Sequence, residues 1–176
     1  GTGAGGGMRD LSSMATEAAG ALAGGQDALR FLLSDEAEPE TRRTIHEEIQ
    51  AFNNAVSQHH RAIRGAGARP LQITVRDGQG QLLGGLVGDT YWGWLDIDDL
   101  WLHESLRGLG YGRRLMAMAE TEALARGCSR AFVRTFSFQA RGFYEQLGYR
   151  VVGRLDDYPP GESFFWLRKE LSREPS

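Results

Sequence analysis

The segment from Asp98 to Arg126 reads DDLWLHESLRGLGYGRRLMAMAETEALAR and contains the signals that decide the fold. Its first residues, as far as Leu102, are typical of the end of a strand. From Tyr111 onward, apolar residues recur at the spacing of a helix face. They are Leu115, Met118, Ala119 and Ala123. The segment therefore predicts a strand, a turn and a helix in succession.

Three glycines occupy alternate positions in the predicted turn. Gly108, Gly110 and Gly112 lack side chains, so backbone amides can approach a ligand closely and a positive φ costs little. The helix that follows directs its unpaired N–H groups and the positive end of its dipole toward the turn. Nearby cationic charge comes from Arg107, Arg113 and Arg114. We therefore expect the turn to hold a phosphate group; a glycine-rich turn without a ligand is the alternative.

The spacing of the glycines separates the possible phosphate ligands. A dinucleotide fingerprint requires Gly-x-Gly-x-x-Gly, and a P-loop ends in Gly-Lys-Ser/Thr; the turn has neither pattern. The run Arg107-Gly108-Leu109-Gly110-Tyr111-Gly112 instead resembles the Gln/Arg-x-x-Gly-x-Gly/Ala signature of the GNAT superfamily of N-acetyltransferases. A nucleotide-binding regulator is disfavoured by the same spacing.

A second motif strengthens this resemblance. Residues 140–149, ARGFYEQLGY, look like the Ala-x-x-Phe/Leu-Tyr-Glu-Lys-Leu-Gly-Phe segment that GNAT enzymes carry behind the glycine turn. The resemblance covers about Phe31 to Leu171 and suggests a bacterial subgroup whose substrate is unassigned. Two motifs in the right order are more specific than either motif alone.

The order of elements predicts an α+β fold. Strands are expected at 28–34, 71–75, 81–90, 95–102, 131–136, 149–155 and 163–167, and helices at 40–54, 57–63, 111–126 and 139–147. The crossover through the glycine-turn helix makes the fourth and fifth strands parallel. We expect a GNAT-like mixed, mostly antiparallel sheet of six to seven strands, flanked by about four helices and splayed between the fourth and fifth strands.

Length and composition are consistent with one ordinary domain. A chain of 176 residues buries about 70% of its unfolded surface, and its single Cys128 excludes a disulfide framework. The net charge of −3 gives no general attraction to nucleic acid, and no apolar run approaches the ~20 residues of a membrane span. We expect a cytoplasmic protein with residues 1–25 as a cloning remnant and flexible extension, 26–172 as the acetyl-CoA-binding domain, and 173–176 as a tail.

The resemblance implies acetyl-CoA as the cosubstrate and no metal. Its pyrophosphate would lie on the amides of the glycine turn, and its pantetheine arm would pair with the splayed strand as an added strand does. Ser137 stands where many relatives carry Asn, which leaves that polar contact weaker or remade. The implied cofactor-binding residues are Leu100, Trp101, Leu102, Arg107, Gly108, Leu109, Gly110, Tyr111, Gly112, Arg113, Ser137, Ala140 and Phe143.

The resemblance also assigns the chemistry. Tyr144 matches the family's tyrosine general acid, although a tyrosine on an amphipathic helix is also common packing. An alkylammonium with a pKa of about 10 must lose a proton before it attacks, so a base or a water path is needed. Asp96 or Asp98 acting through water is the favoured base, and His59 or His60 is an alternative. The carboxylates can equally be solvated or paired with arginines.

The acceptor is expected at an acidic, aromatic mouth. Trp92 and Trp94, together with Asn53 and His60, are the predicted substrate-binding residues, because aromatic walls beside carboxylates suit an organic cation. The tryptophans can equally be hairpin core. These features favour N-acetylation of a small-molecule primary amine by direct attack in a ternary complex. The alternatives are a protein N-terminal or lysine acetyltransferase and an acyl-CoA-binding sensor or scaffold. A homodimer is possible.

Overall fold

The computed structural model describes residues 9–10, 29–63 and 67–172. The chain divides into two compact units, Gly1–Val56 and Ser57–Ser176. The sequence predicts a single domain over residues 26–172, and the start and end of this domain stay a prediction. Apart from Arg9 and Asp10, the expected N-terminal extension lies outside the described residues.

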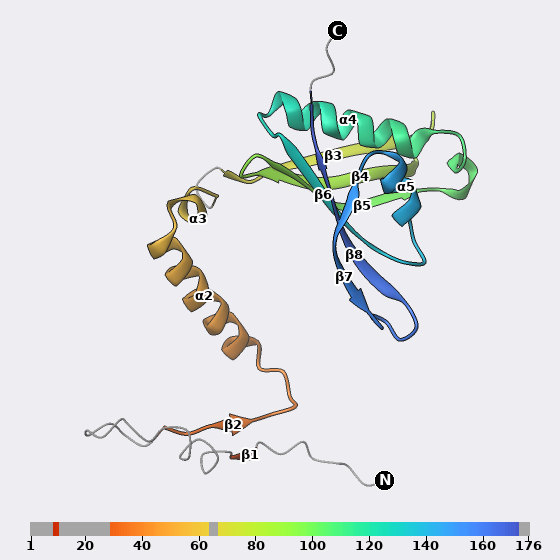
Figure 1. Ribbon diagram of the computed structural model, residues 1–176. Helices are drawn as coiled ribbons and strands as arrows, with labels where there is room; N and C mark the ends of the chain where they lie inside the picture. The colour runs from red at the N-terminus through yellow and green to blue at the C-terminus, as the bar shows by residue number, and fades with distance from the viewer. Residues whose placement is uncertain (1–8, 11–28, 64–66, 173–176) are drawn as a thin grey trace. The chain divides into compact units, whose positions relative to one another are not determined.

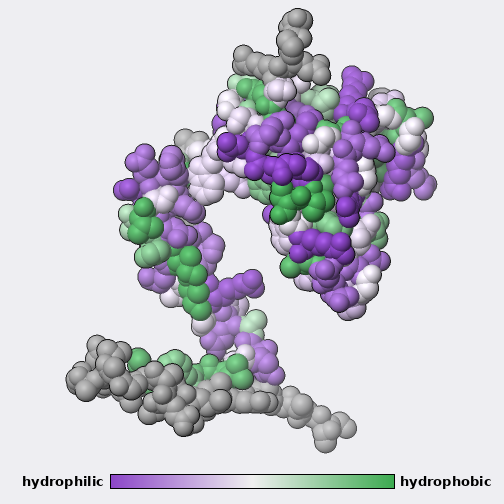
Figure 2. Space-filling model, viewed as in Figure 1, coloured by the Kyte–Doolittle hydropathy of each residue, from purple (hydrophilic) through white to green (hydrophobic). Residues whose placement is uncertain are grey.

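The first unit contains a small sheet and one long helix. Strand β1 (Arg9–Asp10) pairs antiparallel with β2 (Leu32–Leu33). The strand expected over 28–34 is therefore only two residues long in the structure, and it belongs to this separate sheet. Helix α2 (Pro39–Val56) contains the helix predicted at 40–54. Its apolar residues Ile45, Ile49, Phe52 and Val56 follow one another along one face, and Figure 2 shows them as an apolar stripe. The expected packing of this helix on the main sheet stays a prediction.

The second unit begins with a short helix and three antiparallel strands. Helix α3 (Gln58–Ala62) is capped by Ser57, whose Oγ accepts a hydrogen bond from the backbone N–H of His60 at 3.4 Å. Strands β3 (Arg69–Arg76), β4 (Leu82–Tyr91) and β5 (Trp94–Leu102) follow. The turn between the strands expected at 71–75 and 81–90 is at Asp77–Gly80, where Gly80 N donates to Asp77 O at 3.0 Å.

The glycine turn and its helix connect β5 to the second half of the sheet. After the short helix η2 (Glu104–Leu106) come α4 (Tyr111–Ala125), β6 (Arg130–Phe136), α5 (Arg141–Gln146), β7 (Arg150–Asp156) and β8 (Ser163–Glu170). The six-stranded sheet has the order β3-β4-β5-β6-β8-β7, and β5 and β6 are its parallel pair. This confirms the predicted mixed, mostly antiparallel GNAT-like architecture. Figure 1 shows α4 lying across the sheet.

The core lies between the sheet and α4. Leu86, Leu95, Ile97, Val133 and Leu167 on the strands are fully buried against one face of α4. That face consists of Leu115, Met116, Ala119 and Ala123. Met118, predicted on the apolar face, is 47% exposed, and Met116 takes its place in the core. Successive helical residues are 100° apart, so Met118 falls at the edge of the stripe that faces β3.

Two irregularities shape the centre of the sheet. In the β4–β5 ladder Val87 pairs with Asp99 and Gly88 pairs with Ile97, so Asp98 is an extra, bulged residue. Gly88 fits this place because a Cβ there would lie 2.2 Å from the carbonyl oxygen of Asp96. The bulge reverses the alternation of β5, and Leu100 and Leu102 therefore pack on the same core as Leu95 and Ile97.

Strands β5 and β6 part beyond the bulge. They pair only from Trp94 to Ile97 on β5, against Arg130 to Val133 on β6. Beyond that point β5 continues to Leu102 and β6 to Phe136 without pairing to each other. The splay predicted between these two strands is present, so the sheet has an internal edge with free backbone groups.

Candidate active site

The three glycines of the turn meet two different local requirements. Gly108 has φ +73° and Gly110 has φ +84°, a left-handed conformation that side-chain-bearing residues rarely adopt. A Cβ at either position would meet nothing within 4 Å, so the space above the turn is open. Gly112 is required for space instead: its Cβ would lie 3.2 Å from Cζ of Phe143 and 3.7 Å from Cδ1 of Leu102.

Helix α4 presents free backbone donors at this turn. Its first backbone hydrogen bond runs from Arg114 N to Gly110 O at 3.1 Å, and the helix has no side-chain cap. The N–H groups of Tyr111, Gly112 and Arg113 precede that bond and lie at the positive end of the helix dipole. Arg107 fixes the turn to the strand, because its Nε donates to the carbonyl oxygen of Leu102 at 3.1 Å.

A cavity of about 400 Å³ connects the turn with the splay. Leu100 and Leu102 of β5, the glycine turn, and Phe143 of α5 supply its walls. Its lining residues are Leu100, Leu102, Leu106, Arg107, Gly108, Gly110, Tyr111, Gly112, Arg113 and Phe143. Nine of these ten were predicted as cofactor-binding from the sequence, and Leu106 is the one that the motif did not indicate. The glycine turn, the end of β5 and α5 are therefore brought together as expected.

The remaining predicted cofactor residues do not line this cavity. Leu109 is 66% exposed at the tip of the turn, and Trp101 is 47% exposed on the opposite face of β5 from Leu100 and Leu102. Ala140 precedes α5 and its N–H donates to Oγ1 of Thr135. Ser137 holds two loops together: its hydroxyl donates to Glu162, and it accepts from the N–H of Ser163 at 3.0 Å.

Tyr144 is buried next to Phe143, which lines the cavity. It is 5% exposed, and its ring packs edge-on against Phe143 and Tyr149, with centroids 5.2 and 5.9 Å away. Burial, and then the negative charge of Asp99, raise the pKa of Tyr144 to about 12. The phenol therefore keeps its proton throughout the neutral range. Within the described residues its hydroxyl forms no hydrogen bond.

The two candidate bases share one arginine. Arg134 of β6 donates from Nη2 to Asp96 at 3.0 Å and to Asp98 at 3.3 Å. Asp96 also accepts from the Tyr91 hydroxyl at 2.8 Å, and its side chain is only 15% exposed. Asp98 is 46% exposed and stands at the bulge, where the strands begin to part. Burial and the neighbouring Asp96 charge raise the pKa of Asp98, and Arg134 opposes them.

The predicted substrate-binding aromatics lie at the closed end of the strand pair. Trp92 donates from Nε1 to the carbonyl oxygen of His59 at 3.1 Å, and its ring is 4.9 Å from that of His60. Trp94 lies between the guanidinium groups of Arg130 and Arg168, at 5.4 and 5.1 Å. The structure brings Trp92 and His60 together. Trp92 lies in the turn before β5, and Trp94 at the start of that strand is about 10 Å from Ile97, the last residue paired with β6, at 3.3 Å per residue. Asn53 is on α2 in the first unit, and its role stays a prediction.

Sequence reasoning missed an aromatic group at the open end of β6. The rings of Phe136 and Phe138 are nearly parallel, at 9° and 5.1 Å, and Phe136 also meets Tyr158 at 17° and 6.2 Å. Phe164 contacts Phe136 and Tyr158 edge-on. These residues come from three parts of the chain, so only the pairing of β6 with β8 unites them. The crowding of Phe136 and Phe138 within three positions was the one local signal.

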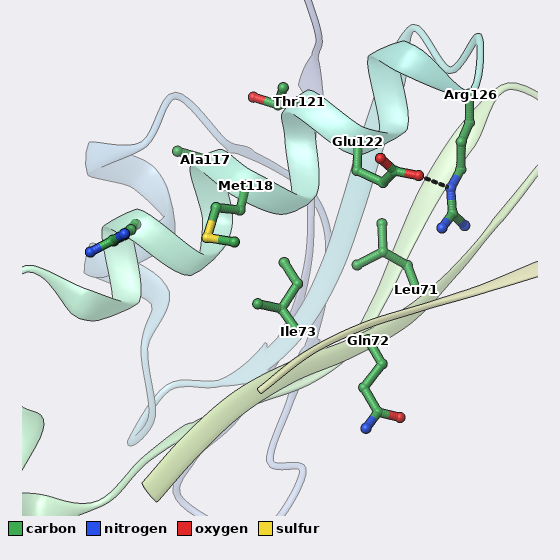
Figure 3. Close-up of a pocket in the computed structure, with 9 residues that line it drawn as sticks. Leu71, Gln72, Ile73, Ala117, Met118, Thr121, Glu122 and Arg126 are labelled. Atoms are coloured by element: carbon green, nitrogen blue, oxygen red, sulfur yellow. Dashed lines mark hydrogen bonds and ion pairs between the residues drawn. The ribbon is translucent and has the colours of Figure 1, made fainter. Parts of the chain in front are cut away.

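A second, larger cavity lies away from the glycine turn. It measures about 560 Å³ and lies between β3 and α4, where Figure 3 shows Leu71, Ile73 and Met118 facing one another. The ion pair between Glu122 and Arg126, 2.7 Å long, closes one end (Figure 3). None of the predicted site residues lines it. The smaller cavity is the candidate active site, because it joins free amide donors to unpaired strand edges.

Among the described helices, none has the length and apolar character needed to cross a membrane.

Comparison with known proteins gives consistent results. The model of the acetyltransferase (GNAT) family matches residues 29–149. Blasticidin-S acetyltransferase of Streptomyces morookaense is 44% identical over 130 residues, which are 70% of this chain and 96% of that protein. An acetyltransferase of Agrobacterium fabrum is 37% identical over 143 residues, which are 81% of this chain and 100% of that protein.

A solved structure agrees with these sequence relatives. The crystal structure of an acetyltransferase from Bacillus cereus superposes with a TM-score of 0.68 at 29% identity, covering 78% of this chain and 96% of that one. The family match extends over more than half of the chain and includes the glycine turn and α5. The chain therefore belongs to the GNAT family of acetyltransferases, and the protein is an acetyl-transferring enzyme.

Proposed function

We propose that the protein transfers the acetyl group of acetyl-CoA to a primary amine of a small molecule by direct attack in a ternary complex. The observation that carries this proposal is the splay of β5 from β6 beside the glycine turn, where a cavity of about 400 Å³ is lined by the end of β5, the turn and Phe143. An extended thioester carrier with a diphosphate fits the free strand edge and the free amides at the same time.

The residues of the cavity suit acetyl-CoA in size and charge. The N–H groups from Leu109 to Arg113 would hold the diphosphate, with Arg107 nearby, and the β6-facing edge of β5 at Leu100–Leu102 would pair with the pantetheine arm. The missing side chain of Gly112 leaves room between Phe143 and Leu102. Acetyl-CoA supplies the activated acyl group; the protein supplies position and charge. N–H donors near Leu102 would stabilise negative charge that develops on the carbonyl oxygen.

Tyr144 is assigned the departing sulfur. A phenol with a pKa of about 12 stays protonated at neutral pH. A free thiol has a pKa of about 8.5, so complete proton transfer from this phenol is uphill. We therefore propose that the Tyr144 hydroxyl donates a hydrogen bond to the coenzyme A sulfur as the carbon–sulfur bond breaks. This hydrogen bond is the first part of the general-acid role predicted for Tyr144. A hydrogen bond to a charged group contributes about 1.5–3 kcal/mol.

Asp98 is the better of the two predicted bases. Asp96 already accepts from Tyr91 and Arg134, and it lies where the two strands are still paired. Asp98 is half exposed at the start of the splay, so it can reach solvent and accept a proton from the acceptor ammonium through water. Together Asp96 and Asp98 carry one more negative charge than Arg134 neutralises, which attracts a cationic acceptor.

Blasticidin S is the first acceptor to test, because a relative 44% identical to this chain is named for it. Thiol release from acetyl-CoA would be measured with blasticidin S, with aliphatic diamines and with a lysine-containing peptide. Turnover with a small amine and none with the peptide is expected, and Tyr144→Phe should lower kcat by roughly 10- to 100-fold. Tight acetyl-CoA binding without turnover on any amine would support the alternative, a binding protein without catalysis.

A further inference from the structure

Two aromatic side chains at the open end of the splay remain exposed. Phe138 is 59% exposed and Tyr158 is 54% exposed, although both belong to the same ring cluster. Phe136 stacks against both of them, and Phe164 meets Phe136 and Tyr158 edge-on at 4.8 and 5.8 Å. Trp166 supports Phe164 in turn at 4.9 Å. The exposed rings are therefore set on a packed base.

The two loops that carry these rings are tied to each other. Ser137 N donates to Ser163 O at 2.7 Å, Ser163 N donates to Ser137 Oγ at 3.0 Å, and the Ser137 hydroxyl donates to Glu162. Within the second loop Tyr158 N donates to Glu162 O at 3.2 Å. Phe138 and Tyr158 are thus held in place before a ligand arrives, which reduces the entropy lost on binding.

The ring cluster shares a face of the sheet with the acidic pair. On β6 the residues Ala131, Val133 and Thr135 point into the core, so Arg134 and Phe136 point to the opposite face. Arg134 contacts Asp98 at 3.3 Å, and Phe136 lies two residues further along the same strand, about 7 Å away. A ligand can therefore place an ammonium near Asp98 and a ring near Phe136 at once.

We propose that Phe138 and Tyr158 form a stacking subsite that selects amine acceptors with a planar, conjugated ring a few ångströms from the amine. Flat rings offer a face to exposed aromatic side chains, and such contacts contribute about 0.5–1.5 kcal/mol beyond the burial of area. A puckered saturated ring of the same size offers hydrogens instead of a π face. Net negative charge around Asp98 fixes the amine end, so charge and shape together define the acceptor class. This inference rests on the proposed function, because it assigns the acceptor side of the same site.

The test uses a matched pair of ligands. Naphthylmethylamine and its fully saturated decahydro counterpart are both primary amines with the same carbon skeleton, and they differ in ring planarity. Calorimetry would measure the affinity of each for the full chain without acetyl-CoA. The wild-type protein should bind the aromatic ligand about 3- to 10-fold more tightly, which corresponds to one or two stacking contacts.

Substitutions then test whether Phe138 and Tyr158 cause the preference for the aromatic ligand. Phe138→Leu and Tyr158→Leu keep apolar bulk and remove the ring, so each should lower the aromatic-to-saturated affinity ratio by about 2- to 5-fold. Phe138→Tyr and Tyr158→Phe keep a ring and should retain the ratio. Because both ligands are measured on the same preparation, a partly unfolded variant changes both affinities equally and leaves the ratio interpretable.

The outcomes separate this inference from the proposed function. Equal affinity of the wild type for both ligands, or a ratio unchanged by the two leucine variants, would overturn the stacking subsite. So would a concentration-dependent dimer that the two leucine variants disperse, since the rings would then be an interface between copies. Acetylation of aliphatic amines alongside such a result would leave the proposed function intact. Ring-selective binding without any acetyl transfer would support the subsite and refute the proposed function.

Discussion

Gly112 allows the sharpest single test of the candidate site. An alanine Cβ at this position would lie 3.2 Å from Cζ and 3.4 Å from Cε2 of Phe143, and 3.7 Å from Cδ1 of Leu102. The first two separations are tight, so the Phe143 ring, which lines the cavity, must shift by a few tenths of an ångström. If this shift displaces the diphosphate enough to lose one charged hydrogen bond, about 1.5–3 kcal/mol is lost. Gly112→Ala should therefore raise the Kd for acetyl-CoA by roughly 10- to 100-fold.

The same substitution should leave stability nearly unchanged. Alanine is favoured over glycine in a helix by up to about 1 kcal/mol, and a displaced Phe143 rotamer costs about 0.5–1.5 kcal/mol. The two effects nearly cancel. Gly110→Ala should behave differently, because its φ of +84° makes alanine lose about 1 kcal/mol of unfolding free energy.

Calorimetry would measure the Kd for acetyl-CoA, and urea denaturation would measure the free energy of unfolding. Gly78→Ala is the matched control, because Gly78 lies in the β3–β4 turn with nothing within 4 Å of its Cβ position. That variant should change neither the Kd for acetyl-CoA nor the unfolding free energy by more than about 0.5 kcal/mol. An unchanged Kd in folded Gly112→Ala would refute the assignment of this cavity to the acetyl donor.

Three further predictions follow from other parts of the molecule. Because the pKa of Tyr144 is about 12, kcat should show no loss attributable to this phenol below about pH 10. The free energy of unfolding should fall above about pH 10, where the phenol ionises in the unfolded chain and stays protonated in the folded one. Profiles of kcat and of urea midpoints against pH for wild type and Tyr144→Phe check both, and an equal fall of the urea midpoint with pH in the variant would contradict the raised pKa. Arg134→Met should cost about 1 kcal/mol of unfolding free energy by leaving Asp96 and Asp98 facing each other, with recovery in the double variant that also carries Asp98→Asn. Glu120→Ala should lower the free energy of unfolding by about 2–3 kcal/mol, because the Tyr149 hydroxyl and Lys169 Nζ, 3.0 and 2.7 Å from the Glu120 oxygens, both lose their partner. The control Glu122→Ala, at a more exposed position of α4, should lower it less. Equal losses in urea denaturation would argue against the buried network.

Most of the fold was predictable because its signals are local. The hairpin turn at Asp77–Gly80, the glycine turn and the end of α4 each depend on a few neighbouring residues, and Gly127 after α4 has the positive φ of 84° that is typical of a helix C-terminus. The strand expected at 28–34 was the exception. Its apolar residues do not indicate which strand it pairs with. In the structure only Leu32 and Leu33 of this segment are in a strand, and they pair with Arg9 and Asp10.

The candidate site was predictable at the glycine turn and less so around the acidic pair. The cavity at the turn is built mainly from consecutive residues around Gly110, so one motif locates most of it. The acidic pair is joined by Arg134, which is brought to it by the pairing of β5 with β6. The aromatic cluster includes Phe164 and Tyr158, which are brought to Phe136 by the pairing of β6 with β8. Single-sequence reasoning has no access to register. It therefore identified Asp96 and Asp98 as a charged pair without the arginine that joins them.

The extra residue at Asp98 bears on how this protein can change over time. Because β5 turns its side chains over at that residue, Leu100 and Leu102 line one surface, while Asp96 and Asp98 belong to the other. The two surfaces share a backbone but no side chain. Point mutations that alter one surface leave the side chains of the other unchanged, so under the proposed function the acceptor side can change while the donor side is retained. Deletion of Asp98 would restore plain alternation and keep Leu100 and Leu102 on the core face, but it would remove the bulge at the point where β5 and β6 begin to part.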